Sequence, residues 1–130
     1  MAIARTRTVQ IGTDETTGVT IATTANSETS EIDWAGNDTS AVEINLYLKF
    51  TSTVTAGTVD VEIRPRQASG GAAFGDVSTQ KVSIAPINGT QNVFVGRFWV
   101  GRYGTLRVVN NATGANATNV LLVEEKFVYS

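Results

Sequence analysis

The sequence predicts an all-β protein, an antiparallel β-sandwich of eight to nine strands with a jelly-roll-like arrangement. Short runs rich in β-branched and aromatic residues alternate with polar residues at period two, the pattern of half-buried strands. Gly, Asn and Pro turn signals separate these runs, and no segment sustains the 3.6-residue period of a helix. At 130 residues the chain is long enough for one core, so we expect a single domain over residues 1–130.

The N-terminal part of the chain predicts short strands with weak patterns. Ile3 to Ile11 mixes apolar residues with Arg, Thr and Gln, so residues 1–12 fit either an edge strand or an arm that lies on a neighbouring subunit. After a turn, Val19 to Thr23 and Glu31 to Trp34 are typical of two brief strands with a polar loop between them.

The middle of the chain carries the clearest alternation. Apolar residues occupy every second position of two segments, namely Val42, Ile44, Leu46, Leu48 and Phe50 in the first and Val59, Val61 and Ile63 in the second. The polar residues between them predict that each strand has one face in the core and one in water. Because a Thr/Ser/Ala/Gly loop joins the two segments, we expect them to pair as a hairpin.

The rest of the chain predicts a long loop followed by further strands. Pro65 removes a ladder donor and ends its strand, and the Gly/Ala-rich stretch from Gln67 to Gly75 is typical of a loop. Val77 to Ile84 predicts a strand that stops before the Asn88-Gly89 turn signal. Three antiparallel strands are then expected over Val93–Val100, Leu106–Val109 and Val120–Val123.

The last third is apolar on both faces of its expected strands. Strict alternation places Val93, Val95 and Trp99 on one face. It places Phe94, Phe98 and Val100 on the other, and Val120 to Val123 is apolar throughout. A strand with one solvent-exposed face would not carry apolar residues on both faces. Either loops and the N-terminal segment of the same chain cover the second face, or the face is a subunit interface.

Composition excludes several classes of function. The net charge of −2 argues against binding nucleic acid, which needs a basic face. The absence of Cys and His removes disulfides, thiolate chemistry and the commonest general base and metal ligand. The N-terminus lacks the apolar segment of a secretory signal, and no run is long enough for a membrane span. We therefore expect no enzyme, no cofactor and no membrane partner.

Three groups of acidic residues are candidate sites. Asp14 with Glu15, and Asp33 with the Asn37-Asp38 pair, offer oxygen ligands for Ca²⁺, as loops of sandwich lectins do. Neither has the spacing of an EF-hand, and turn chemistry explains them better. Asp60 and Glu62 lie two residues apart on the expected solvent-exposed face of one strand. This separation is near that of the carboxylate pair of a glycoside hydrolase. Arg64 and Lys49 are expected on the same face, so cross-strand charge pairing explains this group.

Aromatic rings could stack on sugars. The candidates are Trp34, Tyr47, Trp99 and Tyr103. By its phase in the alternation, Tyr47 is expected to be exposed, whereas Trp99 lies among apolar residues and is expected in the core or an interface. The alternative functional hypothesis is thus a carbohydrate-binding module.

The C-terminal part resembles a known family. The segment Arg102–Asn111 (RYGTLRVVNN), the ATGA loop of residues 112–115 and a final Leu/Val strand are similar to the C-terminal hairpin of small β-sandwich proteins from tailed-bacteriophage virions. In that family an Arg-Tyr-x-x-Leu/Val-Arg-Val strand, an Asn/Gly/Ala/Thr loop and a closing apolar strand recur. Here the closing strand ends in Glu124-Glu125, where the family has an Arg-Leu-Gln-Thr kind of ending.

The resemblance implies a non-enzymatic structural protein of the virion, a capsid decoration (cement) protein or a related tail or fibre module. Its alternative implication is a tail or fibre domain that recognises a host. Such a protein assembles in the host cytoplasm, binds the major capsid protein or another virion protein, and is commonly a homo-oligomer. A trimer would fit a lattice three-fold axis. Contacts are expected from the Ile3–Ile11 arm, the Gln67–Gly75 loop and the C-terminal sheet. The interface residues expected are Ile3, Arg5, Arg7, Val9, Phe74, Phe94, Phe98, Arg102, Tyr103 and Leu121.

Overall fold

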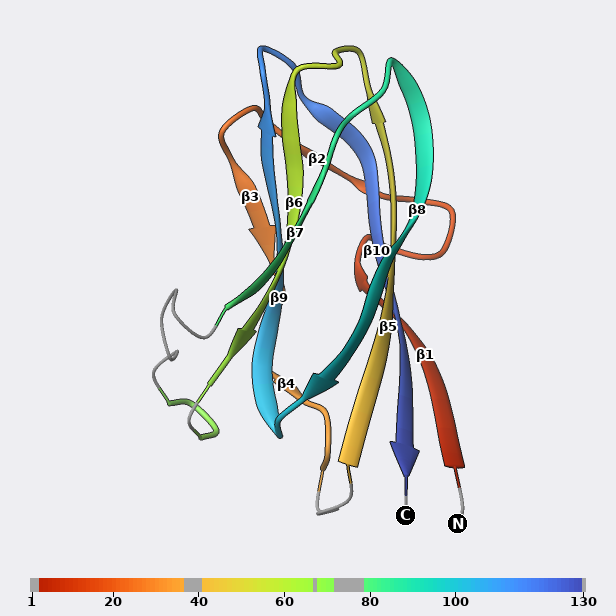
Figure 1. The fold of residues 1–130 in the computed structure, drawn as a ribbon, viewed down its shortest axis with the longest axis vertical. Helices are drawn as coiled ribbons and strands as arrows, with labels where there is room; N and C mark the ends of the chain where they lie inside the picture. The colour runs from red at the N-terminus through yellow and green to blue at the C-terminus, as the bar shows by residue number, and fades with distance from the viewer. Residues whose placement is uncertain (1–2, 37–40, 67, 72–78, 130) are drawn as a thin grey trace.

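Two antiparallel sheets pack face to face as a sandwich, which confirms the expected fold class (Figure 1). The computed structural model describes residues 3–36, 41–66, 68–71 and 79–129. Sheet I contains β1 (Ile3–Ile11), β2 (Val19–Ile21), β5 (Ala41–Ser52), β8 (Gly89–Val100) and β10 (Ala117–Tyr129). Sheet II contains β3 (Asn26–Glu28), β4 (Ile32–Asp33), β6 (Gly57–Pro65), β7 (Gln80–Ile84) and β9 (Tyr103–Ala112).

The strand order is that of a jelly roll. Sheet I runs β1-β10-β5-β8 and sheet II runs β3-β9-β6-β7, while β2 also pairs with β10 and β4 also pairs with β9. Ten strands are present instead of eight or nine. The position beside β10 is shared by β1 and β2, and the position beside β9 is shared by β3 and β4. Both sheets of a jelly roll bury one face against the other, so the core lies between them.

The pairing of neighbouring strands differs from the expected hairpins. β5 and β6 lie in different sheets, and so do β8 and β9, and β9 and β10. Among the described strands, only β6 and β7 are both consecutive and hydrogen-bonded to each other. Glu43 and Lys49 on β5 are therefore on the opposite side of the molecule from Asp60 and Glu62 on β6, and the expected shared face is wrong.

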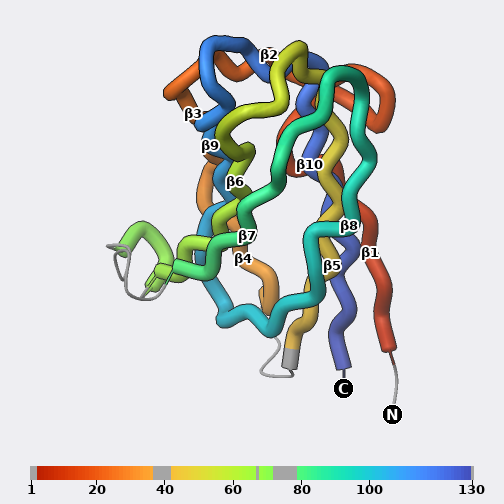
Figure 2. Tube along the Cα trace, turned by 45° about the horizontal axis from the view of Figure 1, so that its top comes forward, coloured from red at the N-terminus to blue at the C-terminus, as the bar shows by residue number. Residues whose placement is uncertain are grey.

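The core is built from the alternation that the sequence displays. On β5 every second side chain from Val42 to Phe50 is buried, and Val59, Val61 and Ile63 on β6 face them from sheet II. Burying each of these side chains contributes about 1.5–3 kcal/mol before the entropy cost of ordering it. The segment Ile3–Ile11 forms an edge strand of sheet I, paired with β10 of the same chain. Both termini lie at one end of this sheet (Figure 2).

The described strands also cover some segments that were expected as loops. β3 falls inside the polar stretch 24–30, and β10 extends to Tyr129, well past the expected end at Val123. Val77 and Phe74 lie outside the described residues. In the described part of the chain, no helix is long and apolar enough to cross a membrane.

Candidate functional site

The outer face of sheet I is the candidate site, and the strand register arranges its side chains in cross-strand rows. Each row consists of residues that lie opposite one another in the β1–β10, β10–β5 and β5–β8 pairings. Starting from the end with the termini, the rows are Ile3–Tyr129, then Arg5–Phe127–Glu43–Trp99, then Arg7–Glu125–Asn45–Arg97, then Val9–Val123–Tyr47–Phe94, and last Leu121–Lys49–Asn92. The row of Arg7, Glu125, Asn45 and Arg97 is entirely polar, and the rows on either side of it each carry two aromatic side chains.

An exposed apolar area occupies the rows nearest the termini. We call it the terminal patch and define it by Ile3, Trp99, Phe127 and Tyr129. Ile3 is 58 % exposed and Trp99 is 60 % exposed. The Trp99 and Tyr129 rings lie 5.8 Å apart at an angle of 48°. The Tyr129 hydroxyl donates to Glu43 Oε1 at 3.2 Å, which fixes its ring in place.

A row of charged residues separates the terminal patch from the rest of the face. Glu125 lies at its centre, where it accepts hydrogen bonds from Arg5 Nη2 at 2.6 Å and from the Tyr47 hydroxyl at 2.8 Å. The Tyr47 hydroxyl, together with the neighbouring Arg5 and Arg7, holds the pKa of the Glu125 carboxyl below its usual value. At the other end of the row, Arg97 Nε lies 3.4 Å from Glu43 Oε1.

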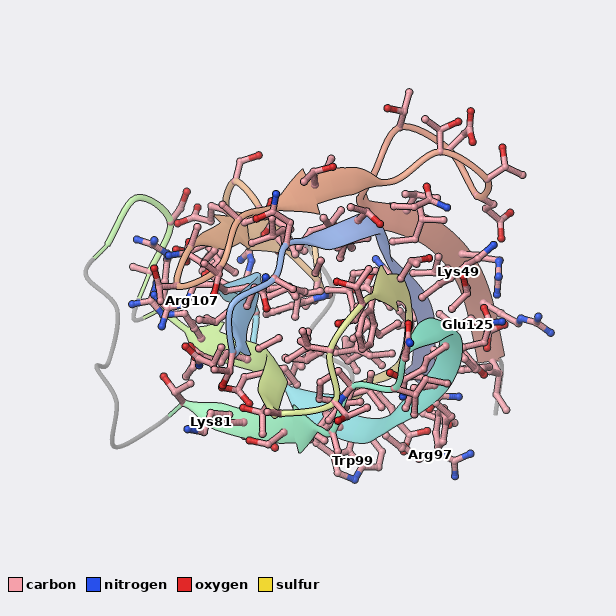
Figure 3. The ribbon with its side chains drawn as sticks, turned by 90° about the horizontal axis from the view of Figure 1, so that it is seen from above. Lys49, Lys81, Arg97, Trp99, Arg107 and Glu125 are labelled. Carbon is pink, nitrogen blue, oxygen red and sulfur yellow. The ribbon has the colours of Figure 1, made fainter. Side chains whose placement is uncertain are left out.

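Beyond the charged row, the face is hollowed. We call this site the hollow, and its volume is about 430 Å³. Val123 and Leu121 form its floor, and the Tyr47 and Phe94 rings stand on one side, 5.3 Å apart at an angle of 49°. Its polar lining comes from Arg7, Glu15, Lys49, Asn92 and Glu125. Figure 3 shows Lys49 and Glu125 on the same side of the molecule.

The charges in the hollow are largely paired. Arg7 Nε donates to Glu15 Oε1 at 2.6 Å, and its guanidinium lies 5.9 Å from the centre of the Tyr47 ring. Glu125 accepts hydrogen bonds from Arg5 and Tyr47. Within the described part of the chain, Lys49 has neither an ion pair nor a hydrogen bond from its side chain, so its ammonium is available to a ligand.

The outer face of sheet II is polar, and several of its charged side chains bond to one another. Arg107 Nε donates to Glu62 Oε1 at 3.0 Å, and Asn111 Nδ2 donates to Asp60 Oδ2 at 2.7 Å. Arg64 Nη1 donates to both carboxylate oxygens of Glu28 at 2.8 Å. Asp60 and Glu62, the carboxylate pair noted in the sequence, are thus each engaged by a different neighbour on β9. Lys81 and Arg107 lie on this side, opposite Lys49 (Figure 3).

The structure places most of the expected interface residues on one face. The group on the outer face of sheet I comprises Ile3, Arg5, Arg7, Val9, Phe94 and Leu121. Leu121 is covered there by its own chain, at 2 % exposure. Phe98 points inward and packs against the core, so its expected outward orientation is wrong. Phe74 lies outside the described residues.

Arg102 and Tyr103 lie apart from this face. They connect β8 to β9, and the Arg102 guanidinium stacks 4.9 Å from the centre of the Tyr103 ring. Arg102 also pairs with Asp33 at 3.2 Å. The expected interface residues do not include Phe127 and Tyr129, although the alternation of Phe127, Val128 and Tyr129 is typical of a continuing strand.

The aromatic candidates for sugar stacking divide between core and surface. Trp34 is 1 % exposed and belongs to the core, so it offers no platform. Tyr47 points outward as expected, and Trp99 is one of the most exposed large apolar residues of the described chain, not a core residue. Tyr103 is half-buried beneath Arg102.

The acidic candidates for a calcium site serve the backbone and neighbouring cations. Asp14 Oδ1 accepts hydrogen bonds from the backbone N–H groups of Thr16 and Thr17, both at 2.8 Å. Asp33 Oδ1 accepts from the backbone N–H of Gly36 at 2.9 Å. Among the described residues, no three acidic side chains gather in one place to hold a metal ion. The Asn37-Asp38 pair lies outside that part.

Comparisons with known proteins give distant similarities of fold. No family model matches the sequence, and no curated protein matches it by sequence. By structure, the chain is similar to a subunit of Bacillus endospore appendages, described as disulfide-linked pili, with a TM-score of 0.45, 12 % identity and coverage of 98 % of this chain and 89 % of that one. It is also similar to VP2 of the infectious bursal disease virus subviral particle, with a TM-score of 0.35, 13 % identity and coverage of 98 % and 42 %. At these values neither neighbour carries information on what this chain does.

Proposed function

We propose that this chain is a non-enzymatic structural protein of a bacteriophage virion, and that it acts as a capsid decoration protein. The proposal rests on the terminal patch, supported by the resemblance of residues 102–123 to small virion proteins. In this role the protein binds the major capsid protein, or another virion protein, after assembly in the host cytoplasm. Its binding stabilises the mature lattice by mass action.

The terminal patch is the observation that carries the proposal. Ile3 and Trp99 are more than half exposed, and Phe127 and Tyr129 lie between them across the sheet. Large apolar side chains that adjoin one another and are rimmed by charge mark a protein contact surface. Arg5 and Arg97 lie at the border of the patch here, and Glu43 lies between Phe127 and Trp99.

The proposal also assigns an oligomeric state. A trimer fits the three-fold positions of a capsid lattice, where one decoration unit touches three capsid subunits in the same way. Sedimentation velocity of the purified chain gives its mass directly. We expect the mass of a trimer.

Binding to purified shells tests the proposal. The chain is mixed with shells assembled from the major capsid protein that the same genome encodes, and bound protein is measured by co-sedimentation. We expect binding and a higher disassembly temperature of the shell. Replacing the two most exposed residues of the terminal patch, in the double variant Ile3→Ser with Trp99→Ser, should weaken binding at least about tenfold, as loss of an interface anchor does.

A matched control keeps the test specific. Ile87, on the connection between β7 and β8, is 50 % exposed and lies outside the terminal patch. Ile87→Ser removes a comparable exposed apolar side chain and should leave shell binding unchanged. A wild-type chain that stays monomeric and does not add to shells contradicts the proposal.

A further inference from the structure

The hollow on the outer face of sheet I has the size of a small-ligand site. Its volume of about 430 Å³ falls within the range of roughly 300–1,000 Å³ that small-molecule sites occupy. A protein partner buries far more surface than this depression offers. The charged row of Arg7, Glu125 and Arg97 lies between the hollow and the terminal patch, and Arg7 and Glu125 also line the hollow.

The apolar parts of the hollow favour a ring-shaped ligand with one apolar face. Phe94 is 54 % exposed, although it is a large aromatic residue on the edge strand of the sheet. Its ring is held against Tyr47, whose hydroxyl is anchored to Glu125 at 2.8 Å. The rings are therefore pre-positioned, which lowers the entropy cost of binding. A pyranose ring presents C–H groups on one face and hydroxyls around its edge, which matches a ring wall beside polar side chains.

The charges of the hollow favour an acidic ligand. Glu15 and Glu125 are both engaged by arginines of β1, and Glu125 also by Tyr47. Lys49 is the lining cation without a partner in the described part of the chain, and Asn92 lies directly opposite it on β8. An ammonium and an amide next to each other suit a carboxylate, which accepts hydrogen bonds from both.

We propose that the hollow binds an acidic saccharide, with the sugar ring stacked on Phe94 and Tyr47 and its carboxylate on Lys49 and Asn92. This site goes beyond the decoration role and does not depend on it. The two are read out by different assays, since shell binding tests the terminal patch and sugar titration tests the hollow.

A pair of sugars that differ in one group tests the proposal. Methyl glucuronide and methyl glucoside share their ring and differ in the carboxylate, so their comparison isolates the role of Lys49. Each is titrated into the ¹⁵N-labelled full chain while amide chemical shifts are followed. We expect millimolar binding of the glucuronide, about two- to fivefold tighter than that of the glucoside, as one half-exposed ion pair gives. The shifts should be confined to amides of β5, β8 and β10 around the hollow.

Three variants assign the interactions. Lys49→Gln should abolish the preference for the glucuronide, and Phe94→Leu, which keeps an apolar side chain but removes the ring, should weaken both sugars. Lys81→Gln, on the outer face of sheet II, is the matched control and should change neither affinity. The proposal is overturned if the two sugars bind equally and Lys49→Gln has no effect. It is also overturned if neither sugar shifts amides of the hollow in a chain whose spectrum shows the native fold.

Discussion

Glu124 places a carboxyl group inside the sandwich, where 3 % of its surface is exposed. Its Oε1 accepts a hydrogen bond of 2.5 Å from Trp34 Nε1, and its Oε2 accepts one of 3.2 Å from Gln10 Nε2. Nearby, Lys126 Nζ donates to the backbone oxygen of Trp34 at 3.0 Å. Burial raises the pKa of the Glu124 carboxyl above its ordinary value, because desolvation disfavours the charged form. The core therefore contains a proton-binding group.

The direction of its effect on stability follows from that raised pKa. The folded protein holds this proton more tightly than the unfolded chain, so the stabilisation is present in acid and is lost as pH rises above the unfolded value of 4.5. Glu124→Gln keeps an acceptor oxygen for Trp34 and has no proton to lose. We measure the free energy of unfolding of both proteins in urea. We expect the value for Glu124→Gln, relative to that of the wild type, to increase as pH rises from 4.5 through the pKa of the folded state. A constant difference between the two curves would contradict this account.

Glu124→Leu separates charge from hydrogen bonding. Leu fills much of the same volume but leaves the buried Trp34 N–H without an acceptor. An unsatisfied buried donor costs about 1–3 kcal/mol, so we expect Glu124→Leu to be less stable than Glu124→Gln at every pH.

At the scale of the element, a bulge in β8 decides which aromatic residues reach the surface. The register against β5 shifts between Leu46 and Tyr47, where Gly96 and Phe94 are the partners and Val95 is the extra residue. Strict alternation predicted Phe94 and Phe98 on one face and Trp99 on the other. Because the bulge reverses the phase, Phe94 and Trp99 both point outward and Phe98 points into the core. The candidate site depends on this one extra residue.

Gly96 makes the bulge possible, and its substitution tests that role. Its φ of 154° lies where side chains are strained, and an added Cβ would come 2.9 Å from the Phe98 ring. We expect Gly96→Ala to lower the free energy of unfolding by about 1–3 kcal/mol. Gly101→Ala is the control, because nothing lies within 4 Å of a Cβ at that position. Equal stability of the two variants in urea denaturation would show that the bulge tolerates a side chain.

At the scale of the whole molecule, the sequence predicts the strands better than it predicts their partners. Alternation is a local property of the sequence. It therefore predicts β5 and β6 together with their buried apolar residues, from Val42 to Phe50 and from Val59 to Ile63. Pairing depends on where each connection leads, and the loop of residues 53–56 crosses between the sheets instead of turning back. The rows of the candidate site combine β1 with β10 and β5 with β8, which are distant in the sequence. No short-range pattern could have shown that Tyr47 meets Phe94, or that Trp99 meets Tyr129.

The two ends of the chain meet at one end of sheet I, and this adjacency gives a prediction for the entire fold. Ile3 and Tyr129 are direct ladder partners, so the last described residues of β1 and β10 lie side by side (Figure 2). A short Gly/Ser linker between the termini can therefore close the backbone without strain. Cyclisation restricts the unfolded chain and leaves the folded one unchanged, so we expect the free energy of unfolding to rise by about 2–4 kcal/mol.

Urea denaturation of the cyclic protein, compared with a linear chain that carries the same linker, measures this gain.

The cyclic protein also tests whether β1 exchanges between copies. In a cyclic chain β1 stays next to its own β10, so an oligomer built on exchanged β1 strands would dissociate, whereas one built on the terminal patch would persist because that patch needs no exchange. We expect the oligomer to persist with its mass unchanged in sedimentation velocity. A cyclic protein that is no more stable than the linear one, or that becomes monomeric, would show that β1 belongs to a neighbouring copy in solution.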